Sequence, residues 1–444
     1  MAMVIKNNMS AVNTLNILNR NQSALAKSLQ KVSSGMKINS AGDDASAYAI
    51  SERMRVQIRS LEQDNQNTQN GNSMMRTAEG AVSSTVEILK TLKEKAINAA
   101  NDTNTDSDRR AIQKEIDQMV DQIDDNALVT YNGKYLVDGS HNTVGAATCT
   151  TLANSALSTA SAWASALTEL KSRTDEGLNI QSTDRLTVSY VRQGKTYTTT
   201  FSVGSGLQMS QIFAKTAWNG TESLVGTDAV RVGSTRESSL VGKDKAGNSV
   251  FTADNKTALS FESAGTGVTY QLSSFTITVM DNLGSIRKIA NTALDSFNET
   301  VRAEYRSNDN ALVLQTGTRA NQAIKVSVTD MRAMALGLKG EDGSVLSIQT
   351  QERANAAINT IDAALQKALD QQATLGAVQS RLNYTSSNLT ISAENVQNSE
   401  STIRDADMAK EMTNYTKNNV LLQAAQSMLA QANQNSAAVL SLLQ

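Results

Sequence analysis

The sequence predicts a mainly α protein in which both chain ends form a long antiparallel coiled-coil rod, with a β-hairpin and an inserted α+β outer domain. Three observations carry this prediction. The 444 residues include no proline, so nothing removes a backbone donor from a long helix. Apolar residues recur every seven positions near both ends, which is typical of helices that supercoil. All six Phe and both Trp lie between residues 163 and 297, where large rings favour a separate compact core.

The two outermost segments read as amphipathic helices. Apolar side chains near the start repeat by sevens, and Gly35 is placed to end that helix. The segment near the finish repeats in the same way and ends in a run of leucines, a pattern typical of an interaction surface. We therefore predict that these ends self-assemble with copies of the same chain, because two isolated stripes cannot cover their own apolar surface. The predicted assembly residues are Leu15, Leu18, Leu25, Leu29, Val32, Tyr415, Leu422, Leu429, Leu440 and Leu443.

Two longer seven-residue repeats lie inside these ends. One starts at Ala47 and the other at Ala354, and each continues for eight successive positions. A helix from Ala45 to Ala100 would be roughly 80 Å long, and it needs a partner along its length. The second repeat is the obvious partner. The predicted coiled-coil positions of the rod are Met54, Leu61, Met75, Val82, Leu89, Ile361, Leu375, Leu382, Leu389 and Val396.

The middle of the chain reads as mixed α and β. Helical patterns occur at Thr151–Arg173, Gly206–Ala217 and Ile286–Tyr305. Alternating apolar residues across 186–203 predict a β-hairpin. The segment Leu312–Val328 alternates in the same way, and we expect it to be a hairpin attached to the helical rod.

Few residues suit catalysis or metal binding. His141 is the one histidine and lies in a polar run that reads as a loop, and Cys149 is the one cysteine. Asp43 and Asp44 precede the long helix, where acidic groups favour the helix dipole. A net charge of −2 gives no reason to expect nucleic acid, and no apolar segment resembles a membrane span or a cleaved signal peptide. We expect no enzyme activity, no metal and no cofactor.

Several motifs at both ends resemble the bacterial flagellin family. The N-terminal matches are SSGMKINSAGDDASAYAI (Ser33–Ile50), NSMMRTAEGAV (Asn72–Val82) and TYNGKYLVDG (Thr130–Gly139). The C-terminal matches are LGAVQSRLNYTSSNL (Leu375–Leu389), STIRDADMAKEM (Ser401–Met412) and LLQAAQSMLAQANQNSAAVLSLL (Leu421–Leu443). They cover roughly 1–140 and 310–444 in the family's order, which makes the resemblance specific.

The resemblance implies five segments and a cellular role. Residues 1–42 and 401–444 would pair as the inner coiled-coil domain, 43–140 and 307–400 would form the helical rod, and 141–306 would be a variable surface domain. The chain would polymerise into the flagellar filament for swimming motility. It would be exported without a cleaved signal peptide. Implied partners are other copies of the chain, an export chaperone at the C-terminal helix, and the filament cap and hook-junction proteins.

Two departures from the family pattern affect these expectations. The segment Leu314–Leu338 often follows the Asn-Gly motif directly in the family, so the outer domain here would interrupt the hairpin region. Many flagellins recognised by the animal Toll-like flagellin receptor carry Arg and Leu where Thr91 and Lys95 stand, although Glu115 matches the third position. We therefore expect weak receptor activation.

The sequence leaves other readings open. A hook–filament junction protein resembles flagellin at both ends, although the large insertion and the QANQNSAAVLSLL ending favour flagellin. Some flagellins carry a protease in the insertion, but a single histidine argues against zinc proteolysis. The Ser and Thr content of the outer domain fits O-glycans, and an added adhesive role stays an alternative.

Overall fold

A computed structural model describes residues 8–215, 225–231, 240–252 and 258–442. The chain divides into two compact units. The first comprises residues 1–68, 315–322 and 384–444, and the second comprises 69–314 and 323–383.

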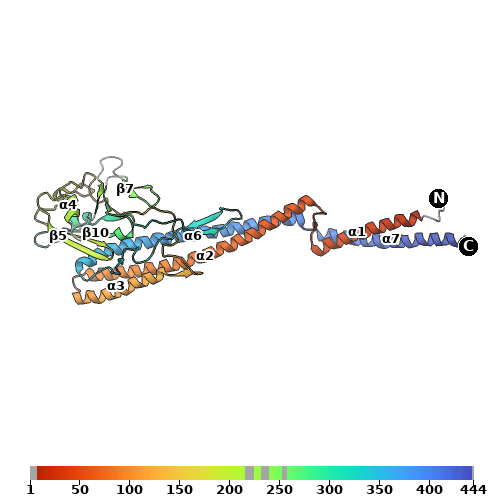
Figure 1. The fold of residues 1–444 in the computed structure, drawn as a ribbon, viewed down its shortest axis with the longest axis horizontal. Helices are drawn as coiled ribbons and strands as arrows, with labels where there is room; N and C mark the ends of the chain where they lie inside the picture. Colours follow the sequence, from red (N-terminus) through yellow and green to blue (C-terminus); the bar gives the residue numbers. More distant parts are fainter. Residues whose placement is uncertain (1–7, 216–224, 232–239, 253–257, 443–444) are drawn as a thin grey trace. The chain divides into compact units, whose positions relative to one another are not determined.

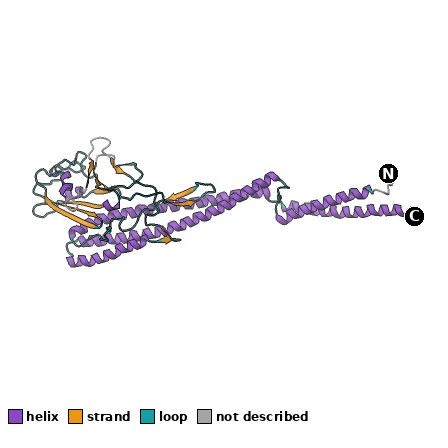
Figure 2. Cartoon of the chain, in the orientation of Figure 1, coloured by secondary structure: helices purple, strands orange, loops and turns teal. Residues whose placement is uncertain are grey.

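Long helices account for both ends of the chain (Figures 1 and 2). The helix predicted for Ala45 to Ala100 has those bounds, and the absence of proline explains its continuity. The expected fold class is confirmed, with long terminal helices, small antiparallel sheets and an inserted domain. The long helices are α1 (Met9–Ser34), α2 (Ala45–Ala100), α3 (Asp106–Ala127), α6 (Gln351–Arg404) and α7 (Met408–Leu442).

Local capping interactions set the helix ends. Gly35 follows α1 with φ +71°, and its N–H donates to the carbonyl of Lys31 at 2.9 Å, which is the cap that glycine favours. At the start of α2, the Asp44 carboxylate accepts the N–H groups of Ser46 and Ala47 at 3.1 and 3.0 Å. Asp44 therefore caps the start of α2, whereas the Asp43 carboxylate accepts the N–H groups of Asn39 and Ser40 at 3.2 Å in the preceding turn.

In the second unit, α2, α3 and α6 contribute to one hydrophobic core. Met75, Val82 and Leu89 of α2 are buried together with Ile361 and other apolar residues of α6. The α3 helix adds three buried residues, and the segment 324–348 contributes further buried apolar residues. The name helical core is used below for this cluster.

Two short hairpins lie beside the long helices. The first joins β1 (Thr130–Tyr131) to β2 (Lys134–Tyr135). The second joins β12 (Leu312–Gln315) to β13 (Ala323–Val326), which confirms the hairpin predicted for 312–328. The chain between them, from 141 to 311, contains the inserted domain.

The inserted domain holds antiparallel sheets over an aromatic core. Phe261, Phe275 and Phe297 make edge-to-face pairs with centroids 5.1 to 5.6 Å apart, a favourable ring geometry. One sheet has the order β10-β4-β5, and another has the order β11-β3-β9-β6. The strands are β3 (Thr151–Asn154), β4 (Arg185–Arg192), β5 (Lys195–Ser202), β6 (Val225–Arg231), β7 (Leu240–Lys243), β8 (Ser249–Phe251), β9 (Leu259–Ser263), β10 (Leu272–Met280) and β11 (Phe297–Val301).

Two helix predictions in this domain were wrong in part. The pattern at Thr151–Arg173 forms strand β3 followed by turns and a short 3-10 turn at Leu167–Glu169. The pattern at Ile286–Tyr305 forms the short helix α5 (Lys288–Leu294) and then strand β11. Both strands pair with distant strands of the same sheet, so tertiary contacts override the local helical spacing. The helix expected within Gly206–Ala217 is present as α4 (Met209–Lys215).

Candidate assembly surface

The N-terminal helix α1 and the C-terminal helix α7 lie side by side and antiparallel within the first unit (Figure 1). Asn8 Nδ2 donates to the carbonyl of Ala432 at 3.3 Å, and Asn21 Nδ2 donates to that of Leu421 at 3.2 Å. Residue numbers therefore rise along one helix as they fall along the other. A short bridge between Met36 and Asp405 continues this register beyond both helices.

The face of α1 toward α7 follows an alternating spacing of three and four residues. The predicted positions Leu18, Leu25 and Val32 are half-buried, whereas Leu15 and Leu29 are exposed. The predicted residues therefore fall into two groups on different faces. The positions on the α7 side of α1 are Ala11, Thr14, Leu18, Asn21, Leu25, Ser28 and Val32.

The α7 helix presents the same spacing. The predicted positions Tyr415, Leu422 and Leu429 are half-buried. The side chain of Leu440 and all of Leu443 lie outside the described residues. The positions on the α1 side of α7 are Glu411, Tyr415, Asn418, Leu422, Ala425, Leu429 and Ala432. These residues and the α1 positions above are called the α1–α7 seam below.

More than half of the α1–α7 seam consists of small or polar residues, which apolar repeats in the sequence do not identify. Asn418 Nδ2 donates to Ser28 Oγ at 2.9 Å, across the two helices. Such polar pairs at core positions of a coiled coil fix its register at a cost in stability. In the sequence, these positions can be recognised because small or polar residues alternate with large apolar ones at the same helical spacing.

Ten further large apolar residues lie on the outside of this helix pair. Within residues 9–34 and 408–435, the buried residues are Ser28, Ala425 and Ala432. The large side chains on the solvent side of α1 and α7 include Met9 at 62% and Met428 at 63% exposed. The others are Val12, Leu15, Ile17, Leu29, Met408, Met412, Val420 and Leu421.

Arg404, at the end of α6, is a residue that the sequence analysis did not single out. Its Nη1 forms a 2.6 Å ion pair with Glu52 Oε1, and its guanidinium lies over the Tyr48 ring, 5.4 Å from the centroid. The hydrogen bond from Arg404 holds the pKa of the Glu52 carboxyl below its usual 4.5. The carbonyl of Arg404 also accepts the Lys37 N–H at 2.7 Å. Arg404 therefore ties the α1–α2 connection to the α6–α7 connection.

The predicted coiled-coil positions of the rod are buried or half-buried in both units. In the second unit, Met75, Val82, Leu89, Ile361, Leu375 and Leu382 are all in the helical core. In the first unit, Leu61 and Leu389 are buried, whereas Met54 and Val396 are half-buried. Side-chain pairs bridge α2 and α6 within the first unit, as Ser386 Oγ donates to Asn65 Oδ1 at 2.7 Å.

Two of the three predicted receptor positions contact each other. Lys95 Nζ on α2 lies 2.9 Å from Glu115 Oε2 on α3, and both side chains are partly exposed. Thr91 lies one turn earlier on α2 and donates its hydroxyl to the carbonyl of Glu87 at 3.1 Å. The carboxylate that matches the family pattern is therefore already paired within this chain.

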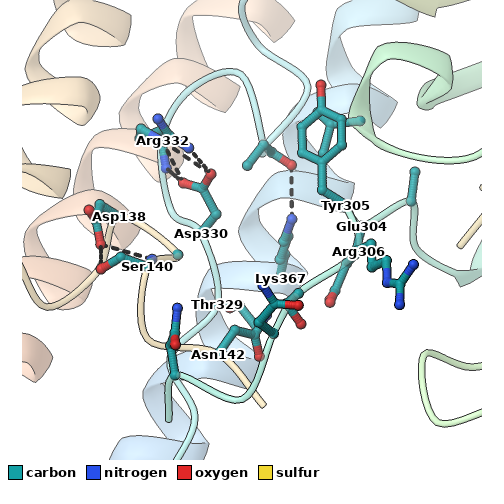
Figure 3. Close-up of a pocket in the computed structure, with 17 residues that line it drawn as sticks. Asp138, Ser140, Asn142, Glu304, Tyr305, Arg306, Thr329, Asp330, Arg332 and Lys367 are labelled. Atoms are coloured by element: carbon teal, nitrogen blue, oxygen red, sulfur yellow. Dashed lines mark hydrogen bonds and ion pairs between the residues drawn. The ribbon is translucent and has the colours of Figure 1, made fainter. Parts of the chain in front are cut away.

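The chain enters and leaves the inserted domain through paired segments of the second unit. The Asn310 N–H donates to the carbonyl of Asn142, and Gly145 and Ser307 exchange main-chain bonds of 3.1 Å. A cavity of about 450 Å³ lies beside these segments. Figure 3 shows its lining residues, among them Lys367 of α6. Lys367 Nζ donates to the carbonyl of Ala335 at 2.9 Å.

Several charged side chains lie in or near this cavity. Burial holds the pKa of Lys367 below its usual 10.5, and the nearby carboxylates of Glu304, Glu299 and Asp330 act in the opposite direction. Asp330 is held by Arg332 at 2.6 Å. The inserted domain contacts α6 through a separate ion pair, in which Arg302 Nη2 lies 2.9 Å from Asp370 Oδ2.

Metal-binding clusters and membrane-spanning helices are both missing from the described ranges. There, no three or more His, Cys, Asp and Glu side chains are grouped so as to hold a metal ion. No described helix has an apolar stretch long enough to cross a membrane. His141, half-buried, contacts the carbonyl of Asn310 through Nδ1 at 3.1 Å. Burial raises the pKa of the Cys149 thiol, which disfavours the reactive thiolate.

Comparisons with known proteins agree at both chain ends. The family described as the bacterial flagellin N-terminal helical region matches residues 5–142, and the bacterial flagellin C-terminal helical region matches 358–443. A flagellin of Clostridium tyrobutyricum is 34% identical over 97% of this chain and 99% of that protein. A flagellin of Bacillus subtilis strain 168 is 30% identical over 99% of this chain and 100% of that protein. The flagellar junction protein FlgL of Legionella pneumophila has a solved structure that is 17% identical, with a TM-score of 0.32, and covers 80% of this chain and 99% of that one.

Three relatives with 30% identity or more over nearly the full chain are two flagellins and a flagellar filament core protein. They favour a filament subunit over the alternative of a hook–filament junction protein. The two matched regions contain α1, α2, α3 and α7, and most of α6. The chain therefore belongs to the bacterial flagellin family and is a structural subunit of the flagellar filament.

Proposed function

We propose that this subunit polymerises through the outward apolar residues of α1 and α7, which become buried when copies pack side by side. The observation that carries the proposal is the contrast within this helix pair. Small and polar residues fill much of the α1–α7 seam, whereas ten large apolar side chains remain exposed. An apolar surface of this extent is typical of an interaction site.

The energetics favour ordering of these helices on assembly. Fully burying one Leu, Ile, Val or Met side chain contributes about 1.5–3 kcal/mol. An isolated pair gains only part of this stabilisation, because its seam residues are mostly half-buried and ten other large apolar side chains are exposed. Each ordered residue also costs about 1–2 kcal/mol of backbone entropy. Neighbouring copies supply the missing apolar contacts. Contacts that repeat head to tail without closing give an open helical polymer.

We infer the same segment roles that the sequence indicated. Residues 1–42 and 401–444 form the inner assembly domain, 43–140 and 307–400 form the rod, and 141–306 form the surface domain. The apolar face of α7 is a suitable site for an export chaperone before assembly, and the exposed ends meet the cap and hook-junction proteins. Export leaves the N-terminus uncleaved. The expectation of weak Toll-like receptor contact is supported by the Lys95–Glu115 pair.

Seeded polymerisation of purified full-length chain tests the outward face. Leu29→Gln removes an exposed apolar group, and Gln30→Ala changes its exposed neighbour as the matched control. We expect Leu29→Gln to slow filament elongation at least tenfold and Gln30→Ala to elongate like the unchanged chain. Equal elongation by both variants would falsify the assignment of this face.

Amide hydrogen exchange tests the ordering step separately. We expect α1 and α7 to exchange rapidly in the dilute subunit and slowly in the filament, while the helical core is protected in both. Slow exchange of α1 and α7 in the dilute subunit would show that they are ordered before assembly.

A further inference from the structure

The sheet with the order β10-β4-β5 has two edges, and the fold closes one of them with hydrogen bonds. At the β10 edge, the Ile277 N–H donates to Asp295 Oδ1 at 2.9 Å and the Val279 N–H donates to Asn291 Oδ1 at 2.7 Å. The carbonyl of Val279 accepts the Arg287 N–H at 3.1 Å. The α5 region therefore forms hydrogen bonds with main-chain N–H and C=O groups of β10 that could otherwise pair with another strand.

The β5 edge is open among the described residues. A two-residue turn at Gln193 and Gly194, with φ of +50° and +70°, joins β4 to β5. In such a hairpin, alternate residues bond to the neighbouring strand. The N–H and C=O groups of Thr196, Thr198, Thr200 and Ser202 therefore point away from β4, and no described residue makes a main-chain bond to them.

This open edge also lacks the side chains that usually block strand addition. Residues 196–202 contain no charged residue and no proline, which are common protections of exposed edges. Lys195 lies at the start of the strand, where the Asp342 carboxylate accepts its ammonium hydrogen bond. Thr198, Thr200 and Ser202 are exposed.

We propose that β5 is a strand-addition site for the β5 strand of a second copy of this chain, paired antiparallel. The strand is complementary to itself, because outward-bonding residues meet outward-bonding residues when Thr198 lies opposite the partner copy's equivalent of Thr200. Hydroxyl side chains then continue on one face and Tyr197, Thr199 and Phe201 continue on the other. Main-chain hydrogen bonds supply the affinity, as in other cases of strand addition.

The binding partner proposed for the β5 edge is a second copy of the same chain. With Lys195 neutralised by Asp342, two β5 strands carry no like charges into the pairing. An antiparallel pair is two-fold symmetric, whereas subunits along one polar filament are related by a screw rotation, so the pairing joins copies in neighbouring filaments. This step rests on the proposed function, in which the inserted domain is left free by the assembly contacts.

One pair of seven-residue strands is too small for a stable dimer of dilute subunits, since specific interfaces usually bury more than about 1,000 Å². Filaments present many copies in a row, and multivalency can strengthen the overall association by about 10²–10⁴. The predicted result is side-by-side bundling of filaments without dimerisation of dilute subunits.

Low-speed sedimentation and electron microscopy of full-length filaments test the proposal. Thr198→Lys places a charge on β5, and Thr292→Lys adds the same charge at an exposed position of α5 as the matched control. We expect filaments of the unchanged chain and of Thr292→Lys to bundle, and bundling of Thr198→Lys to fall at least tenfold while single filaments persist. Amide exchange at Thr196, Thr198, Thr200 and Ser202 is expected to be fast in dilute subunits and slow in bundles.

The outcomes separate this inference from the proposed function. Single filaments of the unchanged chain that never bundle, or bundling of Thr198→Lys equal to that of the control, would overturn strand addition and leave filament assembly intact. Slow exchange of the four amides in dilute subunits would also overturn it, because something else would then cover the edge. A chain that forms no filaments at all would refute the proposed assembly mechanism, and this inference with it.

Discussion

Replacing Glu299 with Gln is expected to remove much of the pH dependence of stability of the inserted domain between about pH 5 and pH 8. Glu299 lies on β11, with its side chain only 11% exposed. Its Oε1 is buried without a hydrogen-bond partner, and Oε2 lies 3.7 Å from Arg302 Nε. Burial raises the pKa of the Glu299 carboxyl from 4.5 to about 7, against the opposing charges of Arg302 and Lys367.

The direction of the effect follows from the raised pKa. The folded chain binds this proton more tightly than the unfolded chain, so the contribution to stability is complete below about pH 4.5. It is lost as the pH rises through about 7. A shift from 4.5 to about 7 corresponds to roughly 3 kcal/mol of unfolding free energy. Stability of the unchanged chain should fall by this order between pH 4.5 and pH 8.

The assay is urea unfolding of the full chain, followed by near-ultraviolet circular dichroism at half-unit steps of pH. Glu299→Gln keeps the shape of the side chain and cannot ionise, so its stability should change less over this range. Asp295, whose pKa burial raises to about 6, leaves a residual slope of the same sign in the variant. Glu169→Gln, at an exposed site of the same domain, serves as the control. Parallel pH profiles for Glu299→Gln and the unchanged chain would refute the reasoning.

Three other comparisons between variants have defined expected outcomes. Leu89→Ala in the helical core should lower the unfolding free energy by about 2–5 kcal/mol. Leu283→Ala, at an 86% exposed site, should leave the unfolding free energy nearly unchanged. Equal urea midpoints for the two variants would contradict this assignment of the core. Gly194→Ala should destabilise the folded chain more than Gly204→Ala does. Both glycines have positive φ, but only at Gly194 would an added Cβ lie 2.5 Å from the Ser344 carbonyl oxygen. Thermal unfolding of the two variants measures the difference. Thr91→Arg combined with Lys95→Leu should raise Toll-like receptor activation at least tenfold in reporter cells, and an unchanged response would contradict the proposed receptor patch.

Helices with a long repeat were the part of the fold that the sequence predicted best. The bounds of α2 and the end of α1 at Gly35 follow from local information, namely apolar spacing, an acidic cap and a glycine. The hairpin of β4 and β5 also follows from alternation around a turn-prone pair of residues. In each case the residues that decide the structure lie within a few positions of one another.

The assembly face was predicted only in outline. The sequence identified apolar residues at both ends but did not separate Leu18 and Leu25, which face α7, from Leu15 and Leu29, which face outward. The distinction depends on where α7 lies, and on polar partners such as Asn418 and Ser28 that are 390 positions apart in sequence. Apolar repeats alone do not contain that information.

The sequence by itself determined the long helices, the family and the confinement of aromatic residues to an inserted domain, because periodicity and composition act locally. Tertiary structure alone decided that residues 151–154 form a strand, since Leu152 lies opposite Phe261 in the sheet. It also decided that Glu299 and Lys367 are buried near each other and that β5 is an open edge. These properties arise from contacts between segments far apart in the chain. A local sequence pattern does not determine the free energy of such long-range pairing.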